Sequence, residues 1–283
     1  MPAPTEITVQ QLNRLVGLPE SPSVLDVRSD DAVARDPRHL PAAVHFDART
    51  AETWAAQYAG KHVVVYCQHG GPLSHGAAAW LREAGAEAES LDGGHEAWVQ
   101  AGGLLVDPGK LPRRDSHGRT VWVTRSRPKV DRIACPWLIR RFVDRDAVFL
   151  FVSATEVEAV AERFRATPFD VEGVLWSHRE GTCTFDTMLD EFGLHCPALD
   201  HLALIVRGAD TARMELAPEA AGLLAASVGF SRMYKDDLQQ LDAAMTLYDA
   251  FYRRLRDAGD ETHNWPAPKP KAEAKAAPKP ARV

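Results

Sequence analysis

Residues 62–78 read HVVVYCQHGGPLSHGAA, and this stretch decides the fold of the first part of the chain. Its apolar run, Val63–Tyr66, is too continuous for a half-exposed strand, so we expect a strand with both faces covered. A helical pattern follows over Gly76–Ala84, and a similar strand-like run, Val24–Val27, comes earlier. Strands that alternate with helices indicate an α/β fold, here a largely parallel sheet flanked by helices.

The second half of the chain has a different pattern, typical of an α+β domain that is mostly helical. Val121–Thr124 and Val148–Val152 are strand-like, and a helix is predicted between them over Asp131–Val143. Beyond Asp186 the pattern turns helical. It is clearest over Leu238–Leu255, where apolar residues recur every three to four positions.

Composition divides the chain into four parts. We expect a first domain over residues 1–107 and a linker over 108–119, which is polar, rich in turn formers and without periodicity. A second domain is predicted over 120–262. Residues 263–283 are mostly Pro, Ala and Lys, which bury too little apolar surface to offset the entropy of ordering, so a disordered tail is predicted there.

Overall composition excludes several classes of protein. The 283 residues carry a net charge of −6, and because residues 266–283 contribute +4, the remainder carries −10. We therefore expect no DNA partner. No apolar run approaches the roughly 20 residues that cross a bilayer, and the N-terminus lacks the features of a signal peptide. The four cysteines form no C-x-x-C pair, so we expect reduced thiols in a cytoplasmic protein without a membrane partner.

Cys67 gives the sharpest chemical signal in the chain. It follows a buried strand directly, and a predicted helix starts near Ser74, so backbone N–H groups and the helix dipole should face the sulfur and lower its pKa. The alternative is a buried cysteine that only fills the end of a strand. The glycine-rich loop favours a reactive thiol. The predicted cradle for a sulfur-bound anion is Gln68, His69, Gly70, Gly71, Leu73, Ser74 and His75.

Four motifs over about residues 5–106 resemble a single rhodanese domain in order and spacing. They are Val24–Arg28, His39–Ala43, the Cys67 loop and Leu91–Trp98. The resemblance implies that Cys67 takes a sulfane sulfur from a donor, holds it as a persulfide and passes it to a thiol acceptor, with no cofactor required. It also implies that Asp26 and Arg28 support the loop.

The loop departs from the rhodanese pattern in length. The opening of the helix arrives one residue late, which brings the loop close to the length found in related phosphatases and arsenate reductases. Those enzymes place an arginine six residues after the cysteine, where this chain has Leu73. The charge near the sulfur therefore depends on His69 and His75. A thiosulfate-like dianion would have to be held by backbone dipoles and a protonated histidine.

A basic run near the start of the second domain suggests an anion site. Residues 124–142 contain six cations, placed at a predicted strand end and over the start of a helix. We predict that Arg125, Arg132 and His178 converge with Asp131 on a pocket for a tetrahedral dianion such as chromate, because guanidinium groups offer paired donors to such an anion. The alternative is a solvated basic edge.

Residues 178–186 contain groups that bind transition metals. His178, Cys183 and Asp186 are suitable donors, although their spacing matches no zinc motif. A transition metal in the second domain is one interpretation, and a hydrogen-bonded histidine is the other. Asp186, with Asp131, could instead pair with the arginines and pin the helices, leaving no open site.

Seven motifs over about residues 120–258 resemble the C-terminal domain of ChrB-type chromate resistance proteins. They are Trp122–Arg125, Asp131–Ile139, Phe169–Val171, Ser177–His178, Cys183–Asp186, Val206–Asp210 and Tyr248–Ala250. The resemblance implies a role in chromate resistance, as a sensor or regulator of chromate export. Regulatory members of that family carry a different N-terminal region for DNA, and a rhodanese-like segment occupies that place here.

The sequence leads to one main hypothesis and two alternatives. The main hypothesis is a cytosolic sulfurtransferase enzyme, fused to a domain that responds to chromate or a similar oxyanion and acts in chromate resistance. The first alternative is a non-catalytic chromate or redox sensor, in which Cys67 reports redox state and transfers no sulfur. The second is a transcriptional regulator of a chromate-resistance operon.

Overall fold

The first domain is built on a parallel sheet, as the sequence predicts. The computed structural model describes residues 5–259 and 261, and the predicted tail over 263–283 lies outside them. In this part of the chain the first sheet has five strands in the order β1-β5-β4-β2-β3, all paired in parallel. The strands are β1 (Glu6–Ile7), β2 (Ser23–Asp26), β3 (Val44–His45), β4 (His62–Tyr66) and β5 (Glu87–Leu91). The helices are α1 (Val9–Leu15), α2 (Asp30–Arg35), α3 (Ala51–Trp54), α4 (Pro72–Glu83) and α5 (Gly94–Gln100).

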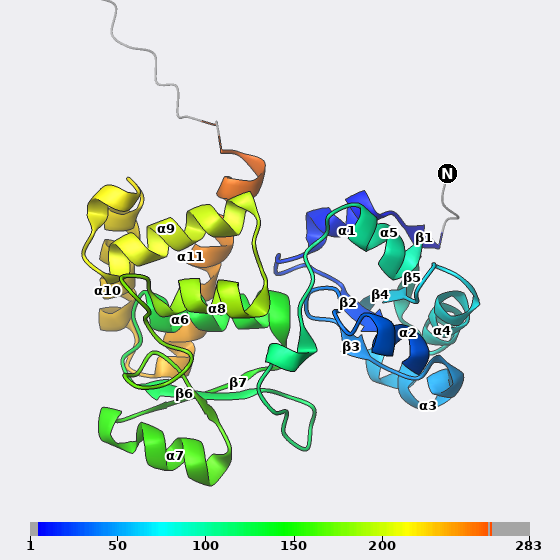
Figure 1. Ribbon diagram of the computed structural model, residues 1–283, viewed down its shortest axis with the longest axis horizontal. Helices are drawn as coiled ribbons and strands as arrows, with labels where there is room; N and C mark the ends of the chain where they lie inside the picture. The colour runs from blue at the N-terminus through cyan, green and yellow to red at the C-terminus, as the bar shows by residue number, and fades with distance from the viewer. Residues whose placement is uncertain (1–4, 260, 262–283) are drawn as a thin grey trace, which may run out of the picture.

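Helices cover both faces of this sheet. Val64 of β4 belongs to the core cluster that includes Trp98 of α5, whereas its neighbour Val65 belongs to a separate cluster with Leu81 of α4. Figure 1 shows α1 and α5 together at one side of the sheet, away from α3 and α4. Because neighbouring residues of a strand point to opposite faces, a strand covered on both sides must be apolar throughout.

The second domain has a smaller sheet between helices. Among the described residues this sheet has three parallel strands in the order β7-β6-β8. They are β6 (Val121–Arg125), β7 (Val148–Val152) and β8 (Thr167–Pro168). The helices are α6 (Asp131–Leu138), α7 (Val157–Phe164), α8 (Thr184–Phe192), α9 (Pro197–Asp210), α10 (Ala220–Met233) and α11 (Asp237–Asp257). Figure 1 shows α7 on one side of the sheet and α6 with α8 on the other.

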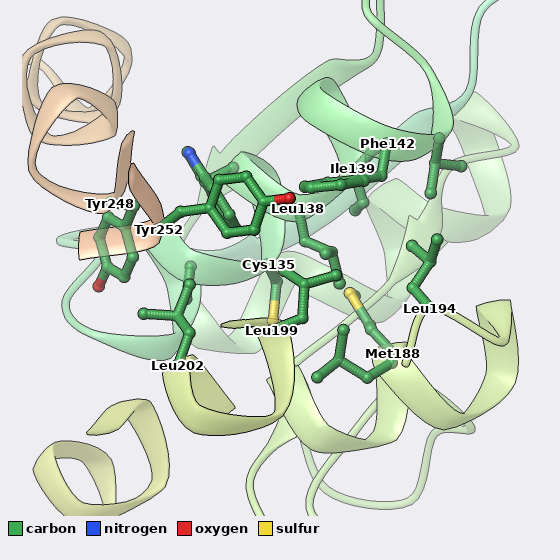
Figure 2. Packing of buried hydrophobic residues seen from close by; sticks show 14 of the residues in the cluster. Cys135, Leu138, Ile139, Phe142, Met188, Leu194, Leu199, Leu202, Tyr248 and Tyr252 are labelled. Atoms are coloured by element: carbon green, nitrogen blue, oxygen red, sulfur yellow. The ribbon is translucent and has the colours of Figure 1, made fainter. Parts of the chain in front are cut away.

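Helix α6 is the centre of the helical layer. The predicted helix over residues 131–143 is one α-helix that continues into a π-helical turn, Ile139–Val143. Cys135 and Phe142 are completely buried, and Figure 2 shows them among side chains from the later helices, including Leu199 and Tyr252. The four cysteines are free. No helix in the described ranges is long and apolar enough to cross a membrane.

The two sheets share one continuous hydrophobic core. The cluster that contains Trp98 extends through Phe142 and Tyr252 into the helices of the second domain. The backbone N–H of Ala42 also donates to the carbonyl of Phe142, at 2.7 Å. The predicted linker, residues 108–119, therefore connects two bodies that already pack against each other.

Gly17 lies at a close contact between the two domains. Its φ is +79°, and a Cβ atom added there would overlap the ring of Phe142 and lie 2.9 Å from Tyr252. Gly60 has a similar φ of +71°, but a Cβ atom there would meet nothing within 4 Å. Alanine at Gly60 would therefore lose stability only through its backbone conformation, whereas alanine at Gly17 would also lose stability through crowding.

We predict that Gly17→Ala destabilises the protein more than Gly60→Ala does. Both variants place alanine in the left-handed region, at about 1–2 kcal/mol. Gly17→Ala adds overpacking, worth about 1–3 kcal/mol. The free energies of unfolding from denaturant titration measure the difference. Equal losses in the two variants would show that the contact between the domains is not tight.

Candidate functional site

Cys67 lies at the carboxyl end of β4, directly before the loop that leads into α4. Its Sγ accepts a hydrogen bond from the backbone N–H of Gly71 at 3.1 Å and lies 3.2 Å from the hydroxyl oxygen of Ser74. The helix begins at Pro72, two residues before the predicted start near Ser74. Proline suits the first helical position because that residue needs no N–H partner. Ser74 thus lies within the first turn of the helix and not at its cap.

The loop that contains Gly93 and Gly94 packs directly against the Cys67 loop. Gly70 has a φ of +65°, and a Cβ atom there would lie 2.6 Å from the backbone nitrogen of Gly93. A Cβ atom on Gly94 would overlap the carbonyl oxygen of Cys67. The N–H of His95 donates to that same carbonyl at 2.9 Å. The motif over residues 91–98 therefore fixes the cysteine loop, a role that the sequence analysis did not assign to it.

The surroundings of Cys67 favour the thiolate. Burial raises the pKa of this thiol, but hydrogen bonds from Ser74 and from backbone N–H groups of Gly71, Ser74 and His69 outweigh burial and bring the pKa below its ordinary value. Burial raises the pKa of Cys135 and Cys183 well above the ordinary value. Of these thiols, Cys67 is the one whose environment stabilises a negative sulfur.

The two histidines of the loop are engaged with carboxylates. Nδ1 of His69 lies 2.6 Å from a carboxylate oxygen of Glu96, and Nε2 of His75 lies 3.1 Å from one of Glu6. Leu73, at the position where related phosphatases have arginine, is part of the lining of a cavity of about 280 Å³. The two histidines that were expected to bind a dianion therefore already pair with glutamate carboxylates.

Asp26 and Arg28 form a buried pair at the end of β2. The guanidinium of Arg28 donates to both carboxylate oxygens of Asp26 and also to the carbonyls of Asp36 and Arg38. Burial raises the pKa of Asp26, but contacts with His45 and Arg28 more than offset this and hold the pKa well below its usual range. The pair ties the strand end to the following segment. The geometry is that of a support and not of a group that touches the sulfur.

In the second domain, the structure brings the four residues of the predicted anion pocket together around an aspartate. Oδ2 of Asp170 lies 3.1 Å from Nη2 of Arg125 and 3.2 Å from Nε of Arg132. Its other carboxylate oxygen, Oδ1, lies 3.3 Å from Nε2 of His178. Asp131 lies 3.6 Å from Nε2 of His178. The cations of the predicted pocket thus face carboxylates.

Sequence reasoning missed two members of this cluster. Asp170 follows β8, which is too short for its pattern to be recognised as a strand. Asp210 ends α9 and entered the sequence analysis only as the last residue of the motif Val206–Asp210, yet its carboxylate lies 3.2 Å from Nε2 of His178. The signal for Asp170 is positional, since polar groups after the ends of neighbouring parallel strands meet at one edge of a sheet.

Asp131 is the most deeply buried group of the cluster. Its side chain is 1% exposed and accepts the backbone N–H groups of Thr184 and Phe185, at 2.7 and 3.0 Å, where α8 begins. Burial, together with the charges of Asp210 and Asp170, raises the pKa of Asp131 to about 8. Hydrogen bonds to Asp170 and Asp210 raise the pKa of His178 to about 10.

The backbone before Asp131 is strained. Val130 has a φ of +38°, a conformation that β-branched residues rarely adopt. The hydroxyl of Ser227 accepts its N–H at 2.8 Å, and the hydroxyl of Tyr248 donates to its carbonyl at 2.7 Å. Helices α10 and α11 thereby fix the start of α6. Strain that the surrounding structure holds in place is typical of functional sites.

The cluster opens on the largest of the cavities described in this structure. Arg125, Asp170, Ser177 and His178 are among the residues that line about 640 Å³ of space. The predicted pocket residues Asp131 and Arg132 are not part of this lining, and Asp131 is completely buried. A ligand in the cavity would therefore meet a guanidinium, an imidazole and a carboxylate.

The predicted metal ligands do not gather as a set. In the described part of the chain, the donor atoms that come within 4.8 Å of one another are those of Asp131, Asp170 and His178. Asp186 instead forms an ion pair with Arg207, at 2.5 Å, and accepts the N–H of Cys183. Cys183 caps the start of α8 as a completely buried thiol. The donor set of His178, Cys183 and Asp186 is therefore corrected to one in which two aspartates accompany His178.

We predict that alkylation of Cys67 titrates well below the value of about 8.5 for a free cysteine. Ser74→Ala removes one hydrogen bond to the sulfur, so the apparent pKa should rise in that variant. Rates of iodoacetamide modification against pH, followed residue by residue by mass spectrometry, measure both values. Earlier modification of Cys135 or Cys183 at neutral pH would refute the assignment.

We predict that Asp26→Asn strongly destabilises the first domain. The substitution leaves the buried Arg28 without a counter-charge, which costs about 3–5 kcal/mol. The matched control is Asp47→Asn, which breaks a pair of the same sequence spacing with Arg49 that is exposed to solvent and so contributes little to stability. Chemical denaturation of both variants gives the comparison. Losses of similar size would mean that the Asp26 pair has no structural role.

Comparison with known proteins identifies both domains. Residues 8–101 match the family model of the rhodanese-like domain, and residues 122–255 match that of the ChrB C-terminal domain. Protein ChrB of Cupriavidus metallidurans is 34% identical over 160 residues, which are 53% of this chain and 48% of that protein. The match thus spans about half the length of this curated relative.

Solved structures are similar to about a third of this chain. A rhodanese-related protein from Thermoplasma volcanium is 22% identical, with a TM-score of 0.31, over 36% of this chain and 96% of that one. A thiosulfate sulfurtransferase from Pseudomonas aeruginosa is 26% identical, with a TM-score of 0.30, over 38% of this chain and 20% of that one. The family models confirm both resemblances that the sequence motifs indicated: the chain joins a rhodanese-like domain to a ChrB C-terminal domain.

Proposed function

We propose that this chain, which joins a rhodanese-like domain to a ChrB C-terminal domain, is a sulfurtransferase that acts in chromate resistance. One observation carries the proposal. Cys67 lies at the start of a helix, and hydrogen bonds from Ser74 and Gly71 favour its thiolate despite burial. The thiolate is the form of cysteine that attacks sulfur.

The reaction has two displacement steps. In the first, the Cys67 thiolate attacks the outer sulfur of a donor persulfide, the donor's sulfur–sulfur bond breaks, and the donor leaves as a thiolate. Cys67 then carries a persulfide whose terminal sulfur is negative. In the second step an acceptor thiolate attacks that terminal sulfur, takes it and restores the Cys67 thiolate. Neither step needs a cofactor or a net oxidant.

The cradle suits the intermediate. A persulfide places its negative charge one atom beyond Sγ, where the N–H groups of the loop and the positive end of α4 would face it. The glycines allow this tight curl, since Gly70 adopts a left-handed conformation against the loop of Gly93. The same donors therefore serve both the thiolate and the persulfide.

The charges near the loop favour a thiol persulfide as donor over thiosulfate. A thiosulfate dianion needs compensating positive charge, and His69 and His75 each pair with a glutamate. Leu73 supplies no charge where an arginine would. A persulfide carries a single negative charge, which backbone donors can stabilise without a fixed cation.

The ChrB C-terminal domain is the proposed chromate-responsive part. Protein ChrB of Cupriavidus metallidurans shares 34% identity, and resistance to chromate is the setting that the family resemblance implies. The cavity beside Arg125 and His178 is the proposed point of contact with an oxyanion. In this proposal the first domain supplies sulfur chemistry and the second responds to the oxidant.

We predict that the full-length protein, incubated with glutathione persulfide and then desalted, gains the mass of one sulfur atom. Cys67→Ser should abolish the gain. Cys196→Ser should not affect it, because Cys196 is half-buried and its pKa is raised. Intact-mass spectrometry reads out both. A protein that gains no sulfur from any sulfane donor would instead be the non-catalytic sensor.

A further inference from the structure

Three carboxylates of the second domain converge on a single ring nitrogen. Nε2 of His178 lies 3.6 Å from Oδ2 of Asp131, 3.3 Å from Oδ1 of Asp170 and 3.2 Å from Oδ2 of Asp210. A protonated ring nitrogen carries one hydrogen, so it can form one well-aligned hydrogen bond. The imidazole N–H therefore cannot bond well to all three facing carboxylate oxygens, although Oδ2 of Asp131 and Oδ1 of Asp170 also accept hydrogen bonds from Thr184.

The spacing of these atoms is that of ligands around an ion. Two ligands that lie about 2.1 Å from a common metal ion are about 3.0–3.4 Å apart in octahedral or tetrahedral arrangements. The distances from His178 to Asp170 and Asp210 fall in that range, and the distance to Asp131 is slightly longer. The donor atoms of Asp131, Asp170 and His178 all lie within 4.8 Å of one another.

Other groups hold the carboxylates in place. Asp131 receives two backbone N–H groups from the first turn of α8. Asp170 directs its other oxygen, Oδ2, toward Arg125 and Arg132, which leaves Oδ1 facing His178 and the hydroxyl of Thr184. Outer groups that orient the ligands in this way are typical of metal centres.

A separate observation points to the same place. Thr124 is completely buried, and its hydroxyl has no hydrogen-bond partner among the described residues. It precedes Arg125 at the end of β6. By strand alternation it shares with Trp122 the face that packs on the helical layer containing Asp131, opposite to Val123. A buried hydroxyl normally has a hydrogen-bond partner, and water bound to an ion on this side of the sheet would be one.

The cavity supplies the access that an ion needs. Asp170 and His178 are in its lining, whereas Asp131 closes the cluster on the buried side. An ion held between them would have protein ligands behind it and open positions toward about 640 Å³ of space beside Arg125. Two carboxylate oxygens and one imidazole nitrogen form a donor set that suits divalent metals such as Mn²⁺, Fe²⁺ or Zn²⁺.

We propose that Asp131, Asp170 and His178 bind one divalent transition-metal ion at the floor of this cavity, with the carboxylate of Asp210 beside the imidazole as an outer group that orients it. The inference does not depend on sulfur transfer by Cys67, which lies in the other domain. A bound ion would add positive charge next to Arg125. Without an ion the carboxylates would repel an oxyanion. With the ion bound, the cluster would attract an oxyanion into the cavity.

The test is binding of Mn²⁺ alone to chelator-treated full-length protein, followed by the loss of the free Mn²⁺ signal in electron paramagnetic resonance. We expect one ion per chain. Asp170→Asn and Asp210→Asn should each weaken binding at least about 10-fold. The matched control is Asp200→Asn, which alters a second cluster in which His195 lies between Asp190 and Asp200 on the surface. This control should bind as the unaltered protein does.

The variants also show what would overturn the proposal. Asp210 is partly exposed, at 21% of its side chain, so Asp210→Asn tests the site even where a substitution of a buried ligand prevents folding. Circular dichroism confirms that each variant is folded. Absence of Mn²⁺ binding by the unaltered chain, or equal binding by folded Asp210→Asn and the Asp200→Asn control, refutes the site.

Discussion

One hydrophobic core runs through both domains and fixes the helix that carries the second candidate site. It begins on the face of the first sheet that contains Val64 and Trp98, and it continues through Phe142 to Tyr252. Helix α6 lies at its centre (Figure 2) and carries Asp131 at its first residue. The other face of the first sheet has its own cluster, which includes Cys67. The geometry of each site therefore depends on apolar packing that lies away from its polar atoms.

The two sites use the same physical device for different groups. Cys67 is stabilised as an anion by N–H groups at the start of α4, and Asp131 receives N–H groups at the start of α8. The outcomes differ because the neighbours differ. At Cys67 the hydrogen-bond donors outweigh burial, so the pKa falls, whereas at Asp131 burial and two further carboxylates raise the pKa to about 8. The N-terminus of a helix therefore does not by itself decide whether a nearby acidic group is ionised, because the neighbouring residues also shift its pKa.

Local patterns predicted the parts of the structure that depend on neighbours in sequence. The apolar run Val63–Tyr66 became a strand covered on both faces, and the glycine-rich loop placed Cys67 at the mouth of a helix. Asp170 was not assigned to the site because the strand before it has only two residues, and Asp210 was not because it reaches His178 from the far end of another helix. The predicted role of Asp186 as a metal ligand also differed from the structure, because Asp186 forms an ion pair with Arg207 of α9. The sequence pattern predicts that a helix is present there but does not show which residues it faces.

The contact at Gly17 has a consequence for how such a chain can change over evolutionary time. The predicted linker separates the domains in sequence, but the rings of Phe142 and Tyr252 lie directly against the first domain. A recombination event that moved either half into another gene would carry an uncovered apolar face with it. The halves of this chain are therefore not interchangeable modules. Any new pairing would have to acquire a complementary surface before it could persist.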